Sequence, residues 1–337
     1  MPLPLIPLVV AGAAAVSAAI ASKKGYDSFQ NMKETKELAE SLEAKYSKTL
    51  KKFESQRDGT NLAFEDFGRL KLEILDGSMR DFVNTFKQIK NIEFSGEIVS
   101  DQFVSDSEVE QFIFFVEKQV VKAGQVMTAG LASLAGGGLA AMGAVGATTT
   151  FAAASTGTAI ATLSGIAAQN ATLAFLGGGS LAAGGLGVAG GTMVLGGIAL
   201  APALAIGSLI FAATTERKLE EMYVKKAEVQ TEIQKLESAT NVMEQIKETT
   251  FSMHNLAKSV DELLLVHVNK MENIIEKNGY DFRNYAKDDQ IVIHHNYKVA
   301  VIMRDLLNTT ILNEQGELTP GLNSLIKSEK QKISTFQ

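Results

Sequence analysis

The sequence predicts an all-α protein: a bundle of long antiparallel helices, or coiled coil, that carries a central apolar helical hairpin assembly rich in Gly and Ala. In the charged flanks, apolar residues recur every three or four positions, which is the spacing of an amphipathic helix. Between Lys122 and Glu216, in contrast, 93 residues pass without a single Asp, Glu, Lys or Arg, and 20 of the 29 glycines lie there. The flanks therefore predict helical stalks, and the middle predicts a segment that acts in or near lipid.

Residues 1–22 form a separate apolar segment that ends at Lys23 and Lys24. A run of about 20 apolar residues is long enough for one membrane span. No positive residue precedes it, unlike in a secretory signal peptide, although Ala19–Ala21 resembles a cleavage site. We expect an uncleaved anchor or an apolar helix packed against the central block, with cleavage as the alternative. If the segment spans, the two lysines place the body of the protein in the cytoplasm.

Two stalk segments flank the uncharged block. Residues 23–122 begin with a charged helix over 26–54, which we expect to break at Ser55–Gly59 before a second helix that Gly77 ends or bends. Residues 216–278 keep an apolar spacing of mostly three and four, which suits coiled-coil packing. These patterns predict a helical stalk in two parts.

A capping signal marks the way into the block. Residues 91–104 are typical of a loop with one short strand. Ser105 and Glu108 are spaced as a capping box, in which each residue bonds to the backbone N–H of the other. We expect a helix to start there and to run from the stalk into the uncharged block.

Residues 279–337 predict a C-terminal helical region. It follows a turn signal at Asn278–Gly279. After an irregular patch, the apolar spacing predicts a helix around 296–312, then a loop over 313–321 and a short terminal helix.

Within the block, residues 123–215, small residues recur every four positions in three series. On a helix each series forms a smooth stripe that lets another backbone approach closely, as between helices in membranes. The positions assigned to this packing are Gly124, Ala132, Gly136, Ala140, Gly157, Ala161, Gly165, Gly179, Ala183, Gly187 and Gly191. A soluble Ala/Gly core is the alternative, but each helical glycine costs about 1 kcal/mol relative to alanine. Because large apolar residues are few, insertion would be only mildly favourable, which suggests a segment able to live in two environments.

Residues 154–197 (ASTGTAIATLSGIAAQNATLAFLGGGSLAAGGLGVAGGTMVLGG) carry a family resemblance. They resemble a glycine-zipper block of uncharacterised bacterial helical membrane proteins with an apolar N-terminus. Their alternation of an Ala-Ile-Ala run with a GGG run is similar in texture to the membrane segment of interferon-inducible glycine-rich proteins. The plan of a helical stalk with an apolar head is similar to that of α-helical pore-forming toxins. These resemblances imply membrane association and supply no catalytic residue.

Motifs for other chemistry are weak. Gly185, Gly187 and Gly190 match the dinucleotide motif, but no strand precedes them and no acidic residue follows about 20 positions on. His294–His295 lacks the surrounding pattern of a metal site, and we interpret both as solvated or partly buried structural histidines. The chain has no cysteine, and its net charge of −6 disfavours nucleic acid. We expect no enzyme activity, no cofactor and no metal.

These observations lead to a membrane-inserting protein that forms pores or perturbs the bilayer, with self-association through its helices. Positive residues flank the apolar segments: Lys23, Lys24, Lys122, Arg217 and Lys218. All can lie on one side of the bilayer if the block crosses it an even number of times. Two alternatives stay open: a soluble helical scaffold that binds a partner, or an integral membrane sensor or immunity component whose C-terminal helices, near 290–337, recognise a protein.

Overall fold

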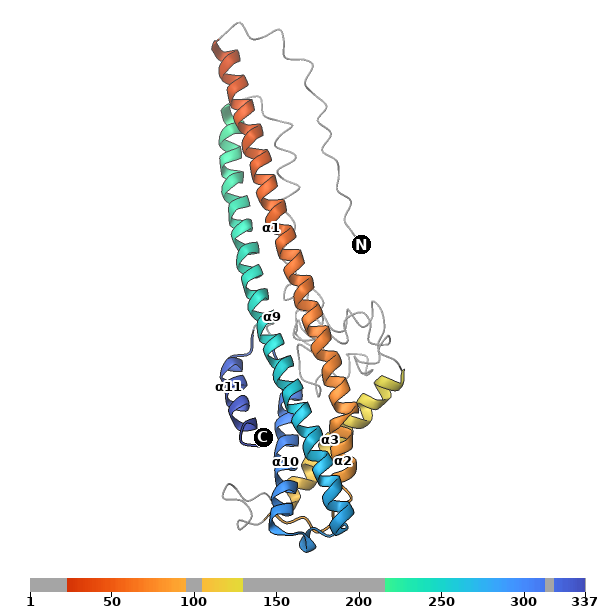
Figure 1. The fold of residues 1–337 in the computed structure, drawn as a ribbon. Helices are drawn as coiled ribbons and strands as arrows, with labels where there is room; N and C mark the ends of the chain where they lie inside the picture. The colour runs from red at the N-terminus through yellow and green to blue at the C-terminus, as the bar shows by residue number, and fades with distance from the viewer. Residues whose placement is uncertain (1–22, 95–104, 130–215, 313–317, 337) are drawn as a thin grey trace. The chain divides into compact units, whose positions relative to one another are not determined.

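The computed structural model describes residues 23–94, 105–129, 216–312 and 318–336 (Figure 1). Within these ranges the protein is all-α, as predicted, and contains no strand, only isolated bridges. The elements are α1 (Lys23–Asp76), α2 (Ser78–Phe86), α3 (Asp106–Ala129), α9 (Glu216–Asn278), the 3-10 helix η4 (Phe282–Asn284), α10 (Lys287–Asn308) and α11 (Leu322–Ile333). The N-terminal segment 1–22, most of the uncharged block and part of the loop over 313–321 lie outside the described residues.

The helix α1 is continuous where the sequence predicts a break. It passes through Ser55–Gly59 without interruption, so that prediction is wrong. A Cβ placed on Gly59 would meet only the Lys247 side chain, at 3.8 Å, and the helix is therefore not forced open there. Buried residues on both sides, Phe53 and Thr60, hold the helix in place, and their contacts offset the propensity cost of one glycine, about 1 kcal/mol.

The end of α1 lies where the sequence places it. Gly77 separates α1 from α2, and a Cβ at this position would approach the carbonyl oxygen of Glu73 to 2.9 Å. Only glycine allows this close approach without a shift of the backbone. The helix that follows, α2, buries Met79 and Phe82.

The described chain divides into two compact units. Among the described residues, unit 1 comprises those up to Arg57 and those from Glu216 to Met243, and unit 2 comprises those from Asp58 to Ala129 and from Glu244 onward. The long helices α1 and α9 contribute to both.

In both units α1 and α9 run parallel, which corrects the antiparallel arrangement that the sequence suggests for these two helices. In unit 1, Tyr223 donates a hydrogen bond to Glu34 (Oη–Oε1, 2.7 Å). In unit 2, Phe67 of α1 faces His254 of α9, with ring centroids 6.3 Å apart. The next helix, α2, continues in the same direction along α9, where Ser78 donates to Asp261 (Oγ–Oδ1, 2.5 Å) and Thr85 to Glu272 (Oγ1–Oε1, 3.3 Å). Short connections make neighbouring helices antiparallel, but more than a hundred residues separate Asp76 from Glu216.

The helix α10, in contrast, doubles back along α9 in unit 2 (Figure 1). The turn at Asn278–Gly279 that joins them is confirmed. Asn278 donates to Asp289 (Nδ2–Oδ2, 2.9 Å), and further along Asn296 donates to the backbone oxygen of His267. The helix begins at Lys287, nine residues before the predicted start, because the acidic pair Asp288–Asp289 lies in its first turn, where the helix dipole favours negative charge.

Unit 1 has a small core between two helices. Its buried apolar residues are Ala39, Leu42, Tyr46 and Phe53 from α1, with Val229, Ile233, Leu236 and Met243 from α9. Spacings of three, four and seven along each helix are those of a coiled-coil seam. The described buried contact in unit 1 is therefore a single seam between α1 and α9.

Unit 2 has a larger core to which all the helices with described residues in this unit contribute. Aromatic rings lie at its centre: Phe112 meets Phe82 and Tyr297 edge-on, with centroids 6.2 and 5.1 Å apart. Residues from the C-terminal helices, such as Ile293 and Leu306, are fully buried in it. The C-terminal region is therefore part of the core of unit 2 and not a separable module.

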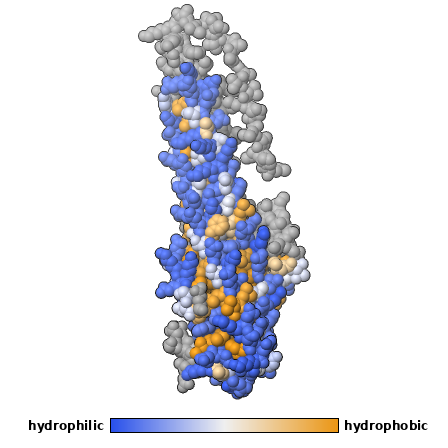
Figure 2. All heavy atoms as spheres, viewed as in Figure 1, coloured by the Kyte–Doolittle hydropathy of each residue, from blue (hydrophilic) through white to orange (hydrophobic). Residues whose placement is uncertain are grey.

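The surface is mostly hydrophilic on the face shown in Figure 2, where apolar side chains form only small patches. Among the described residues, none of the helices combines the length and the apolar character that a membrane crossing requires.

Candidate functional site at the entry to the uncharged block

The start of α3 is fixed by the predicted capping box. The backbone N–H of Ser105 donates to Glu108 Oε2 (2.9 Å), and the backbone N–H of Glu108 donates to Ser105 Oγ (3.4 Å). Backbone and hydroxyl donors from Ser105 lower the pKa of the exposed Glu108 carboxyl. Two N–H groups that a helix start leaves without intrahelical partners are satisfied in this way.

One face of α3 packs in the core of unit 2 along its whole described length. The buried residues recur at spacings of three and four: Val109, Phe112, Ile113, Val116, Val120, Ala123 and Val126. Gln119 also donates to Asn308 of α10 (Nε2–Oδ1, 2.8 Å). The first residues of the uncharged block, 123–129, thus continue α3 and pack against the body.

Gly124 marks the closest approach of α3 to the junction between α1 and α2. A Cβ at Gly124 would overlap Nη2 of Arg80 and would lie 3.2 Å from Oδ1 of Asp76. Arg80 and Asp76 form an ion pair across the break at Gly77. Glycine at 124 therefore lets α3 lie directly on this pair.

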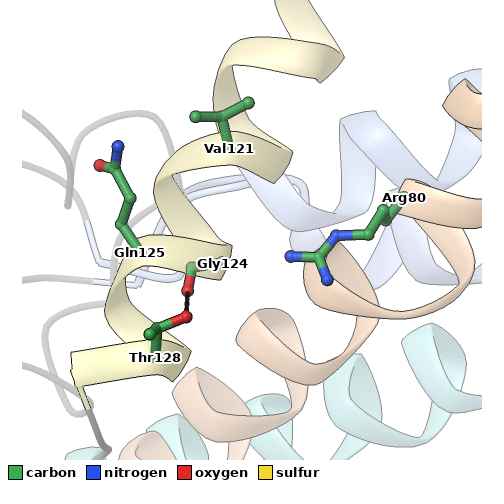
Figure 3. A pocket seen from close by; sticks show the side chains of 5 residues that line it. All are labelled: Arg80, Val121, Gly124, Gln125 and Thr128. Atoms are coloured by element: carbon green, nitrogen blue, oxygen red, sulfur yellow. Dashed lines mark hydrogen bonds between the residues drawn. The ribbon is translucent and has the colours of Figure 1, made fainter.

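A shallow pocket of about 550 Å³ opens at this contact, lined by Arg80, Val121, Gly124, Gln125 and Thr128 (Figure 3). The Arg80 guanidinium extends toward α3, while Gln125 and Val121 are exposed. Thr128 Oγ1 donates to the backbone oxygen of Gly124 (2.8 Å), which is the local bond that hydroxyl residues make in apolar helices. The lining offers three polar groups: the Arg80 guanidinium, which is already paired with the Asp76 carboxylate, the Gln125 amide and the Thr128 hydroxyl. This chemistry suits the anchoring of a helix end.

The other predicted site residues are placed as follows. Of the small-residue positions, Gly124 alone is described; Ala132, Gly136, Ala140, Gly157, Ala161, Gly165, Gly179, Ala183, Gly187 and Gly191 lie outside the described residues. Lys122 is exposed on α3. The backbone of Lys23 and Lys24 begins α1, and that of Arg217 and Lys218 lies in the first turn of α9; their side chains are outside the described part of the chain.

Sequence reasoning missed a fully buried lysine in unit 2. Lys71 Nζ lies 4.5 Å above the ring centroid of Phe67, and burial lowers the pKa of Lys71 to about 7. Its position was the available signal, because it falls four residues after Phe67 and three before Ile74, on the apolar face of α1. A charged residue on such a stripe is seldom fully buried.

Of the two histidines interpreted as solvated or partly buried, His295 is partly buried, whereas His294 is only 4% exposed. His267 is also buried, at 3% exposed. In the described part of the chain, no group of three His, Cys, Asp or Glu side chains is placed to hold a metal ion.

Comparisons with family models, with curated proteins and with solved structures find no match for this chain. Its function is therefore argued from its own residues.

Proposed function

We propose that this chain is a membrane-inserting helical protein in which the uncharged block enters the bilayer and the helical body holds it. The observation that carries the proposal is the run of 93 residues without an Asp, Glu, Lys or Arg. A charged side chain at the centre of a bilayer costs about 3 kcal/mol or more. A segment that inserts into lipid is therefore expected to lack charged residues. At about 20 residues per span, the block is long enough for up to four crossings.

The geometry of α3 supports this role. Its start is capped at Ser105 and its end rests on Arg80 through Gly124. Because Ala123 and Val126 pack in the body, we place the lipid-facing part after Ala129. The helix α3 then acts as a fixed base from which the block departs, and α9 receives the chain on its return.

Two outcomes are open for the inserted block: a pore or a perturbed bilayer. The stripes of small residues favour close helix packing. Self-association of inserted blocks would then line a pore, whereas a single hairpin assembly would only disturb the lipid.

The test is leakage and flotation with dye-loaded liposomes, using the full-length chain. We expect the protein to float with the vesicles and to release the dye. The double variant Gly187→Leu with Gly191→Leu should lose most of the leakage, because it blocks a packing stripe. Gly59→Leu is the matched control outside the block, since a Cβ at this position meets only the Lys247 side chain, at 3.8 Å. A wild-type chain that neither floats nor releases dye refutes the proposal.

A second candidate is a soluble scaffold whose block completes its own core. It is favoured by the burial of Ala123 and Val126, and by the use of Gly124 for close packing inside the body. If this candidate is correct, the protein should be monodisperse without detergent. It should also remain in the supernatant after lipid is removed. Retention in the membrane pellet after a carbonate wash would eliminate it.

A further inference from the structure

In unit 2, His267 and His295 meet the C-terminal residues, and His294, the neighbour of His295, packs against Phe94. His267 lies on α9, and His294 and His295 lie on α10. The ring of His295 lies 6.4 Å from that of His267 and 6.2 Å from that of His294, centroid to centroid. The residues after α11 close the cluster, because the ring of Phe336 meets the His295 ring edge-on at 5.2 Å.

Two buried ring nitrogens of the cluster favour neutral imidazoles, because they have no acceptor for a second proton among the described residues. Nε2 of His267 donates to the backbone oxygen of Phe336 (3.1 Å), since a carbonyl can only accept. Nδ1 of His267 is then the unprotonated nitrogen, and it is buried without a hydrogen-bond partner among the described residues. Nε2 of His294 is also buried without a hydrogen-bond partner among the described residues. A second proton on either ring would find no acceptor there.

The charges around the cluster also oppose protonation. Lys270 on α9 acts on His267 and His295, and Lys298 on α10 acts on His294. On α11, Glu329 and Lys332 form an ion pair with each other (Oε1–Nζ, 2.7 Å). The Phe94 ring lies against His294, and the neighbouring residue Glu93 interacts with Arg283.

Burial is the main cause of the resulting shifts. It lowers the pKa of His294 to about 4, and it lowers the pKa values of His267 and His295 below their ordinary range. The nearby lysines act in the same direction, while the bond to Phe336 opposes the shift at His267. Docking of α11 is therefore fully stable above the ordinary histidine pKa and loses stability as the pH falls toward the folded values.

We propose that His267, His294 and His295 form an acid-sensitive latch, which releases α11 and the residues after it from α9 and α10 when the pH falls below the ordinary titration range of histidine. Protonation would place like charges in one buried cluster next to Lys270 and Lys298. Release would expose the apolar face of α11, formed by Leu322, Ile326 and Ile333. The latch lies in the described body and does not depend on membrane insertion.

The experiment is hydrogen exchange of the full chain, followed by mass spectrometry at pH 7.5 and pH 5.0 with correction for the chemical exchange rate. We expect the protection of α11 to fall about 10-fold or more at the lower pH, which is the effect of one pKa unit at a single site. Unchanged protection of α11 between the two conditions would overturn the latch.

A triple variant separates the latch from general acid sensitivity. His267→Gln keeps a donor for the Phe336 oxygen, and His294→Phe and His295→Phe keep the ring contacts, but none of the three titrates. Protection of α11 should become independent of pH in this variant and stay pH-dependent in the control His254→Gln, a histidine of α9 outside the cluster. An undiminished fall in the triple variant contradicts the proposal.

A proton NMR titration of the wild-type imidazoles covers the case in which the triple variant does not fold. The rings of His267 and His294 should remain neutral until the pH at which α11 loses protection. Normal titration of both rings near pH 6.5, with α11 still protected, would also overturn the latch.

Discussion

Unit 1 and unit 2 share the helices α1 and α9 and differ in what covers them. In unit 1 the described core is a seam of eight buried apolar residues between these two helices. In unit 2 the same parallel pair is joined by α2, α3, α10 and α11, and more than forty buried apolar residues form the described core. One pair of helices thus supports two very different densities of packing.

The difference predicts two levels of local stability. Segments with few buried apolar contacts open at lower free energy than core segments, even within one cooperative chain. Unit 1 should therefore exchange its amides sooner than unit 2.

The same substitution in both units should have unequal costs. Phe82 is fully buried in unit 2, between Phe86 and Phe112, and Phe53 is 3% exposed in the unit 1 seam. Phe82→Ala should lower the free energy of unfolding of unit 2 by about 3–5 kcal/mol, because a cavity remains in a crowded core. Phe53→Ala should cost less, since the two-helix seam can close around the gap. Urea denaturation with segment-resolved hydrogen exchange measures both costs. Equal costs would contradict the expected difference in packing between the two units.

The buried lysine should give unit 2 a pH dependence that unit 1 lacks. The pKa of Lys71 is about 7 in the folded chain, against an ordinary value near 10.5. Between these values the unfolded chain holds one more proton, so the free energy of unfolding should rise with pH by about 1.4 kcal/mol per unit. At pH 7 and below, the burial penalty is present in full.

Lys71→Met should remove this slope and stabilise unit 2 most at or below pH 7. Denaturation at pH 7, 8 and 9 provides the measurement, with Lys258→Met, an exposed lysine of α9, as the control. A slope that persists in Lys71→Met would show that another group causes it.

Local signals in the sequence predicted local structure well. The capping box at Ser105, the end of α1 at Gly77 and the turn at Asn278–Gly279 were all predictable, because each depends on bonds or steric limits within a few residues. For the same reason Gly59 misled the prediction: a glycine can end a helix, but here the helix is held by buried contacts on both sides.

Long-range features could not be predicted in the same way. The parallel direction of α1 and α9 depends on a connection of more than a hundred residues, whose path no spacing rule determines. The meeting of His267 with His295 and Phe336 depends on the fold of α10 and α11 over α9. Gly124 was assigned to helix packing within the uncharged block, and that assignment stays a prediction; the contact of Gly124 with Arg80 could only be found in the structure.

A double-mutant cycle at the entry site should show whether α3 is anchored in unit 2. Gly124→Ala should change the free energy of unfolding by less than about 1 kcal/mol, because the flexible end of Arg80 can move aside and the loss of its contacts offsets the gain in helix propensity. In an Arg80→Ala background the same change should be neutral or stabilising, with a coupling of about 1–2 kcal/mol. Gly59→Ala, which meets no such obstacle, should stabilise by about 0.5–1 kcal/mol. Additive effects of Gly124→Ala and Arg80→Ala would show that α3 does not depend on this contact.

The smallest effect is expected at the start of α3, where one helix that covers unit 2 depends on its cap. Ser105→Ala removes the hydroxyl that accepts from the Glu108 N–H, at a cost of about 1 kcal/mol. Ser107→Ala is the control: it removes a hydroxyl contact to Ser105 Oγ (3.1 Å) but no cap of a backbone N–H, and it should cost less. The pKa of Glu108 is lowered in the folded chain, so the contribution of the cap should be present above pH 5 and decline as the carboxyl is protonated at lower pH. Because α3 contributes to the core of unit 2 alone, faster exchange should be confined to the amides of unit 2; an equal increase in unit 1 would mean that the two cores open together.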